Sequence, residues 1–200
     1  MEIVDTEISY IEDLNLMIEV FMKPLVSKFS LTAKESLDIF SNIDGIVAVN
    51  SNIATELSVS LQTLPKHQIP IGQIYFKWAP FLKLYTTYCQ NHTNALITLG
   101  KIEKKHKDLS VFLREAAESQ SSCRGLYFKD FLIKPVQRIM KYPLLFNTVL
   151  QYTSPQSGEY RSLEDCLRLF SNIVTDINEI HDRSLRFQEL IDANDRITDY

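Results

Sequence analysis

The chain has 200 residues, 45% of them hydrophobic, so it can bury one substantial core as a single domain. Its 21 lysines and arginines against 25 aspartates and glutamates give a net charge of −4, which argues against a general nucleic-acid binder. Only five glycines are present, which favours an all-α fold. The sequence has no apolar run of the roughly 18–20 residues that a membrane span needs, and its start lacks the pattern of a signal peptide.

Cysteine and histidine patterns argue against a disulfide framework and a metal site. Cys89, Cys123 and Cys166 are odd in number and far apart, so we expect reduced thiols in the cytosol. The four histidines show no HExxH-type spacing. Neither GxGxxG nor GxxxxGK followed by Ser or Thr occurs, so the sequence shows no phosphate cradle. We therefore expect no cofactor and no covalent enzyme chemistry.

The first predicted helix runs from about residue 3 to residue 28, because apolar residues recur there at helical spacing. Carboxylates crowd its first half. On residue chemistry alone, Glu7 would simply complement the positive end of the helix dipole. A second helix is predicted from a capping box, Thr32 to Glu35, to about residue 64.

A break from Pro65 to Pro70 precedes a helical segment that is dense in aromatic residues, a pattern typical of core. Thr93 is predicted to cap the next helix, from residue 94 to about 107, whose last lysines suit a helix C-terminus. A basic membrane-facing patch is the alternative interpretation of residues 101–107. A short helix at residues 109–119 and a polar loop to residue 122 follow.

Residues 128–152 combine a helical pattern with two prolines and many polar groups. One side should pack inward: Leu132, Val136, Ile139, Pro143, Phe146 and Leu150. A second stripe follows at steps of four, four and three residues: Ile133, Gln137, Lys141 and Leu144. This mixture of apolar and polar groups indicates a docking surface. The helix should bend at Pro135 and Pro143, because each proline removes a backbone N–H and crowds the preceding turn.

Turn residues at 153–158 lead into a final long helix from about residue 160 to residue 180. Asn178 lies inside this helix, where plain exposure would explain it. From residue 186 the apolar period is lost, so residues 186–200 are predicted to be a helical tail or a linker.

The segment IKPVQRIMKYPLL, residues 133–145, strongly resembles the signature of the Dbl-homology (DH) domain, the exchange module for Rho-family GTPases. Further blocks resemble the same family in the same order, namely Thr6-Glu7, Tyr10, Leu14, Phe21, Pro24-Leu25, Ile71-Gly72, Tyr85, Tyr88-Cys89, Asn91 and Ile177-Asn178. The resemblance implies an all-α, elongated DH-type bundle of long, proline-kinked helices over residues 1–185. DH domains usually precede a PH domain, for which we expect too few residues after the last helix.

The resemblance also implies a function, a guanine-nucleotide exchange factor for a Rho-family small GTPase of Rho or Rac type. Such a factor binds switch I and switch II, displaces Mg²⁺ and GDP, and stabilises the nucleotide-free state. It implies that Glu7 contacts switch I. Gln137, Lys141 and Asn178 would contact switch II, and Ile133 and Leu144 would supply apolar contacts. Lys134 and Arg138 leave this stripe, and internal salt bridges explain them as well as partner contact does.

Three positions depart from the family pattern. Asn50 replaces a frequent histidine and should hydrogen-bond between helices. Phe146 replaces a leucine and should alter only packing, whereas Asn147 replaces a common basic residue and could tune GTPase preference. The alternatives are a non-catalytic helical adaptor on a DH scaffold and a lipid-surface bundle using residues 101–107. We expect a cytoplasmic protein, recruited to the membrane or cortical cytoskeleton only indirectly or through a neighbouring domain.

Overall fold

The computed structural model describes the backbone of residues 2–198 and the side chains of residues 2–180, 182 and 183. Over this range the chain forms helices and no strand. The first half holds α1 (Glu2–Leu16), the π-helical η1 (Met17–Met22), α2 (Lys23–Lys28), α3 (Ala33–Phe40), α4 (Ile43–Thr63), the 3-10 turn η2 (Lys66–Gln68), α5 (Ile71–Trp78) and the 3-10 turn η3 (Ala79–Phe81). The second half holds α6 (Leu84–Lys105), α7 (Leu109–Glu118), the 3-10 turn η4 (Ser121–Cys123), α8 (Phe128–Leu132), α9 (Lys134–Gln151) and α10 (Tyr160–Thr198).

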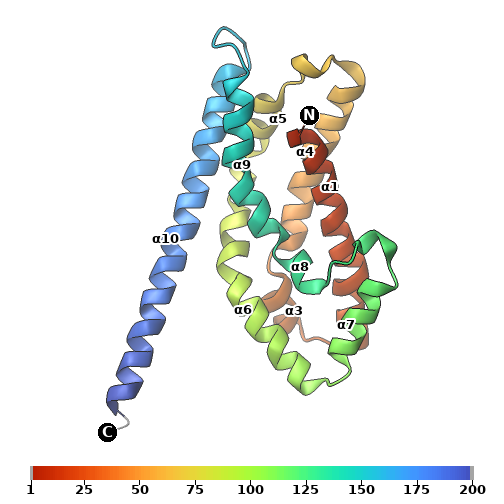
Figure 1. The fold of residues 1–200 in the computed structure, drawn as a ribbon, viewed down its shortest axis with the longest axis vertical. Helices are drawn as coiled ribbons and strands as arrows, with labels where there is room; N and C mark the ends of the chain where they lie inside the picture. Colours follow the sequence, from red (N-terminus) through yellow and green to blue (C-terminus); the bar gives the residue numbers. More distant parts are fainter. Residues whose placement is uncertain (1, 199–200) are drawn as a thin grey trace.

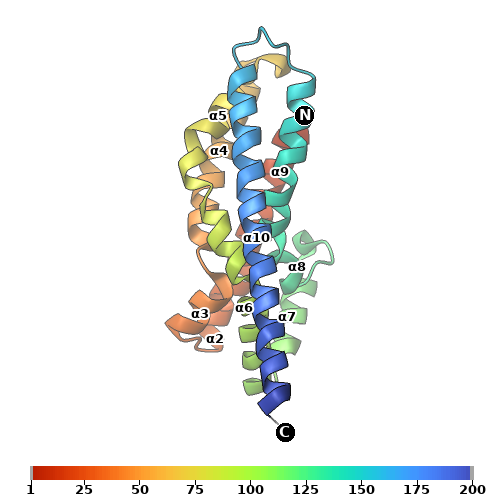
Figure 2. The ribbon, with the colours of Figure 1, turned by 90° about the vertical axis from the view of Figure 1, so that its left-hand side faces the viewer.

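The helices form an elongated bundle, which confirms the predicted fold class (Figure 1). The first helix, α1, packs against α4 and α9, while α10 lies along α9, α5 and α6. A quarter turn shows α9 and α10 side by side on one face of the bundle (Figure 2). The start of α1 lies near the α4–α5 connection, and the far end of α10 lies at the opposite end of the molecule.

Two aromatic clusters fill the core. Phe21 packs against Phe128 and Phe131, with ring centroids 5.2 and 5.5 Å apart, and so joins the first helical segment to α8. Tyr142 stacks on Phe170 at 4.4 Å, which joins α9 to α10. Aromatic pairs of this kind add about 0.5–1.5 kcal/mol beyond the burial of their surface.

The predicted helix over residues 3–28 is present but is interrupted by the π-helical turn η1. At the end of that turn the Lys23 amide donates to the Ile18 carbonyl, five residues back. Pro24 follows directly and has no N–H, and a proline ring would crowd the carbonyl four residues before it in an α-helix. The wider π turn relieves this contact, so Pro24 explains why the helix departs from α geometry there.

The predicted helix from residue 32 to residue 64 is two helices, so that prediction was wrong in its extent. The capping box is confirmed, with Glu35 N donating to Thr32 Oγ1 at 3.1 Å and Thr32 N donating to Glu35 Oε2 at 2.8 Å. The break comes at Ser41, whose φ is 50°, and at Asn42, whose side chain donates to the Leu84 carbonyl at 2.9 Å. A long-range hydrogen bond thus fixes a turn that no proline or glycine marks.

Thr93 does not cap a new helix, because α6 runs without a break from Leu84 to Lys105. The predicted helices around 109–119 and 160–180 are present as α7 and α10, and α10 continues across residue 185. The predicted bend at Pro135 is a break, since α8 ends at Leu132 and α9 begins at Lys134. Pro143 lies inside α9, which continues through it.

The three cysteines form no disulfide. Burial raises the pKa of the Cys89 and Cys166 thiols to about 12. These two thiols therefore stay protonated at neutral pH, the form that reacts slowly with oxidants and alkylating agents.

Among the residues that the structure describes, no helix has the length and apolar character needed to cross a membrane.

Gly72 allows α5 and α10 to approach closely. A Cβ atom at this position would lie 2.8 Å from the Leu163 amide nitrogen and 3.0 Å from Ser162 Cβ. Backbone atoms cannot move aside as the end of a flexible side chain can, so this contact requires a glycine.

We predict opposite effects for two glycine-to-alanine substitutions. Gly72→Ala should lower the free energy of unfolding by about 1–3 kcal/mol, because it forces α5 away from α10. Gly100→Ala should raise that free energy by about 0.5–1 kcal/mol, because Gly100 lies inside α6 with nothing within 4 Å of the point that a Cβ atom would occupy. Urea unfolding followed by circular dichroism measures both. Equal stability of the two variants would contradict the close contact.

Candidate functional site

An exposed stripe runs along α9 and consists of Ile133, Gln137, Lys141 and Leu144; we call it the α9 stripe. Gln137, Lys141 and Leu144 are exposed, and Ile133 is partly buried. Leu144 is 69% exposed, a large value for a leucine inside a helix. Ile139 and Phe146, on another side of α9, are buried as predicted. Val136, Pro143 and Leu150, which were also predicted to face inward, are only partly buried.

Glu2, at the start of α1, lies beside this stripe. Its Oε1 is 3.6 Å from Lys141 Nζ, and the two side chains are 66% and 51% exposed. An exposed pair of this kind stabilises a fold by only about 0–1 kcal/mol. Each group can therefore leave this ion pair and bind a partner protein at little energetic cost.

Asn178, exposed on α10, borders the same side of α9. A groove of about 310 Å³ lies between α10 and the neighbouring helices α6 and α9. Its α9 wall is Val136 and Met140, and Asn178 stands on the α10 wall. Asn178 therefore lies across this groove from Val136 and Met140, which directly precede Gln137 and Lys141 of the α9 stripe in the chain.

Glu7 does not reach this surface. Its exposed fraction is 0%, which is inconsistent with the prediction that it contacts a partner. Glu7 is five residues from Glu2 on α1, and five residues rotate a helix by about 140° from its starting direction. Glu2 therefore points outward beside Lys141, whereas Glu7 points into the bundle.

The buried Glu7 carboxylate forms an ion pair with Arg138 of α9, whose Nε donates to Glu7 Oε2 at 3.1 Å. Tyr75 Oη donates to the same oxygen at 2.8 Å, and Tyr142 Oη lies 3.0 Å from both Glu7 Oε2 and Asn50 Oδ1. Asn50 therefore hydrogen-bonds between helices as predicted. This network therefore joins α1, α4, α5 and α9.

Protonation in this network is fixed by its surroundings. Burial, followed by the charge of Glu7, raises the pKa of Tyr75 and Tyr142 well above the ordinary value, so both hydroxyls remain donors. Burial alone would lower the pKa of Arg138, but Tyr142 and Glu7 raise it above the ordinary value. The guanidinium therefore stays charged.

Lys134 is also engaged inside the protein. Its Nζ lies 2.8 Å from Asp13 Oδ2, and Arg124 pairs with the other oxygen of the same carboxylate. The internal salt bridges considered for Lys134 and Arg138 are thus present.

Sequence reasoning missed Glu2 and misplaced Glu7. A signal for the burial of Glu7 was present, because Ile3, Glu7, Tyr10 and Leu14 follow one another at steps of four, three and four residues. That spacing places Glu7 on the inward face of α1. Only a buried cation on another helix makes a carboxylate acceptable there, and the sequence did not identify it.

The RhoGEF domain model matches residues 1–178 of this chain. The chain belongs to the RhoGEF domain family. Two relatives from Dictyostelium discoideum are similar to this RhoGEF domain. The Myosin-M heavy chain is 37% identical over 196 residues, which cover 98% of this chain and 11% of the relative. The RhoGEF domain-containing protein gxcJ is 34% identical over 177 residues, which cover 88% of this chain and 14% of the relative. The chain therefore spans only a small part of these relatives.

Solved structures share the bundle. A structure of the Vav1 exchange factor superposes with a TM-score of 0.79 at 25% identity, over 96% of this chain and 50% of that chain. The DH/PH fragment of PDZRHOGEF, solved in complex with human RhoA, superposes with a TM-score of 0.80 at 22% identity, over 90% and 52%. At 22% identity, the likeness to the PDZRHOGEF fragment shows the fold alone. This RhoGEF domain corresponds to about half of each solved chain.

We predict that Arg138→Met lowers the free energy of unfolding by about 3–5 kcal/mol, because it leaves the Glu7 charge buried without its cation. The double variant Glu7→Gln with Arg138→Met should be less destabilised than Arg138→Met alone, since neither charge then remains. Lys141→Met is the control, and its effect should stay within about 0.5 kcal/mol because its ion pair is exposed. Urea unfolding of the three variants measures these differences. A double variant less stable than the single one would contradict this account.

Proposed function

We propose that this RhoGEF domain is a guanine-nucleotide exchange factor that binds a Rho-family small GTPase of Rho or Rac type. Its binding surface would be the exchange face, which we define as Glu2, Ile133, Gln137, Lys141, Leu144 and Asn178. The observation that carries the proposal is the 69% exposure of Leu144, in the same stripe as Lys141, which lies beside Glu2. An exposed leucine among charged and amide groups is typical of a protein-binding surface. Membership of the RhoGEF domain family supports a GTPase as the partner.

Nucleotide exchange requires no covalent step. The factor must bind the nucleotide-free GTPase more tightly than the nucleotide-bound form, because only differential binding shifts a conformational equilibrium. GTPases hold their nucleotide largely through Mg²⁺ and the phosphate-binding loops, with the switch regions closed over them. A protein that holds both switches in displaced positions therefore releases Mg²⁺ and weakens GDP binding.

The residues of the exchange face would divide this task. Glu2 would leave its ion pair with Lys141 and accept hydrogen bonds from switch I. Lys141 would then donate to carbonyls or a carboxylate of switch II, together with Gln137 and Asn178. Ile133 and Leu144 would exclude water around these polar contacts, which strengthens them.

Glu7 has a different part in this proposal. Through Arg138 it holds α1 against α9, and this contact sets the position of Glu2 relative to Lys141. It would therefore support exchange by positioning the exchange face, without touching the GTPase.

We predict that Lys141→Ala and Leu144→Asp each lower the rate of fluorescent-GDP release by at least about tenfold, which corresponds to the loss of one well-packed or charge-assisted contact. The assay uses a panel of Rho- and Rac-type GTPases with the 200-residue chain. Lys101→Ala is the matched control, because Lys101 is an exposed lysine on α6, outside the exchange face. Circular dichroism should show unchanged helix content for all three variants.

Unchanged exchange in both variants would overturn the assignment of the face. If no GTPase in the panel responds to the wild type, capture of nucleotide-free GTPases decides between two interpretations. Binding without exchange would favour the adaptor alternative, and no binding would refute the proposed partner.

We further predict that Glu2→Gln and Glu7→Gln distinguish a residue that contacts the GTPase from a residue that stabilises the fold. Glu2→Gln should slow exchange about tenfold with an unchanged urea midpoint, because Glu2 is exposed. Glu7→Gln should lower the free energy of unfolding by about 3 kcal/mol, because Arg138 loses its buried counter-charge. A Glu7→Gln variant of normal stability that still lost exchange would restore a direct role for Glu7.

A further inference from the structure

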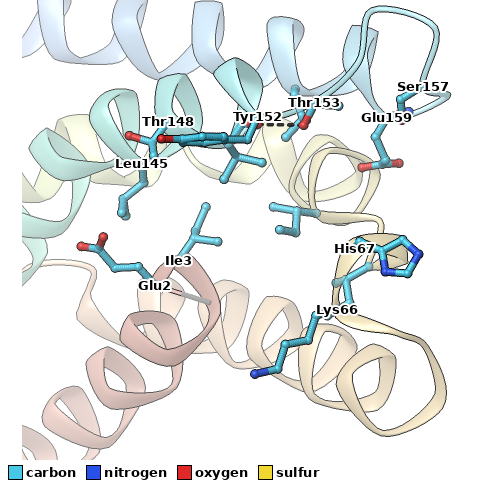
Figure 3. Close-up of a pocket in the computed structure, with 14 residues that line it drawn as sticks. Glu2, Ile3, Lys66, His67, Leu145, Thr148, Tyr152, Thr153, Ser157 and Glu159 are labelled. Atoms are coloured by element: carbon cyan, nitrogen blue, oxygen red, sulfur yellow. Dashed lines mark hydrogen bonds between the residues drawn. The ribbon is translucent and has the colours of Figure 1, made fainter.

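A cavity of about 360 Å³ lies at the end of the bundle where α1 begins. Its wall combines the start of α1, the α4–α5 connection, the last turns of α9 and the first turn of α10 (Figure 3). Segments far apart in the chain therefore meet around one space. This volume falls within the range of about 300–1,000 Å³ that small-molecule sites occupy.

The inner surface of the cavity is apolar. It is formed by five buried side chains, namely Ile3, Ile69, Ile71, Leu145 and Leu163. Tyr152 also lines the cavity, although 88% of its side chain is exposed. The apolar part of a small ligand would bury surface against all of these side chains, and such burial is the main source of affinity in small sites.

Glu159 supplies a polar group that its protein neighbours leave half satisfied. Its Oε2 accepts from the amides of Gly72 at 2.8 Å and Gln73 at 3.4 Å. Its Oε1 is buried and has no hydrogen-bond partner among the residues that the structure describes. Figure 3 shows this carboxylate between Thr153 and His67. Glu159 lines the cavity, and the last torsion of a glutamate is broad, so rotation of the carboxylate can present Oε1 to a bound donor.

The charge of the lining favours a cation over an anion. Glu2 and Glu159 provide two carboxylates, and Lys66 provides one ammonium group. Burial raises the pKa of Glu159, as expected for a carboxylate that lacks a counter-charge. A donor carrying positive charge would both satisfy Oε1 and favour the ionised carboxylate.

We propose that this cavity binds a small organic cation whose apolar body lies on Ile3, Ile71 and Leu163 and whose amidinium or ammonium head donates to Glu159. The site adjoins the exchange face, with which it shares Glu2. Its occupancy is measured without any GTPase, so its failure would leave the proposed function untouched.

The probe is benzamidine, a compact aromatic ring with an amidinium group, and benzoate is the matched anion of similar shape. Titration of the ¹⁵N-labelled chain should shift the backbone amides of Ile3, Gly72 and Leu163 in a saturable manner. We expect a dissociation constant on the order of 1 mM for benzamidine. Benzoate should produce no saturable shift of these amides.

Two variants localise the effect. Glu159→Gln keeps an acceptor for the Gly72 amide but places an NH₂ group at the other position, so benzamidine should bind about tenfold more weakly. Thr148→Trp places a large ring at an exposed position on the cavity wall and should abolish binding while leaving the helix content unchanged. If Glu159→Gln fails to fold, Thr148→Trp alone decides.

The absence of saturable shifts with benzamidine would overturn the proposal. Equal binding of benzoate would refute the cation preference, and binding that persists in Thr148→Trp would place the probe elsewhere on the protein.

Discussion

The ion pair between Glu7 and Arg138 joins the first helix of the bundle to the helix that carries the exchange face. Burying two charges is costly, and their attraction offsets that cost only when their remaining hydrogen bonds are also made. Here Tyr75, Tyr142 and Thr6 complete the bonding around the pair. Any shift of α1 along α9 would break several of these bonds together, so the pair fixes one register between the two helices.

This register explains how α9 serves two purposes. Arg138, Ile139, Tyr142 and Phe146 are buried and fix its rotation, while Gln137, Lys141 and Leu144 are left on the outside. Because the buried residues alternate with the exposed ones along a single helix, the core determines where the exposed groups point. A rigid element of this kind holds functional side chains more accurately than a loop does.

The features that sequence predicts well are those decided by near neighbours. The capping box at Thr32 and the two faces of α9 depend on residues three or four positions apart. The break at Ser41 and Asn42 was missed, because it depends on the Leu84 carbonyl, 42 residues from Asn42. Glu7 was assigned to the partner surface through the family resemblance, although its spacing places it on the inward face of α1. Its burial also requires Arg138, 131 residues away. The outward direction of Glu2 became evident only when α1 and α9 were placed together.

The π-helical turn at Met17–Met22 restricts how the length of the first helical segment can vary. A π turn holds one residue more than the α-helical turn it replaces, so removing one residue from it would restore ordinary α-helical hydrogen bonding. The parts before and after the turn would then keep nearly the same relative rotation. Glu7, before the turn, pairs with Arg138, and Phe21, within the turn, packs on Phe128 and Phe131. A single insertion between Glu7 and the turn would rotate Glu7 by about 100° relative to Phe21 and could not preserve both contacts. The turn can therefore absorb a single deletion in this stretch, whereas a single insertion would break one of the two contacts.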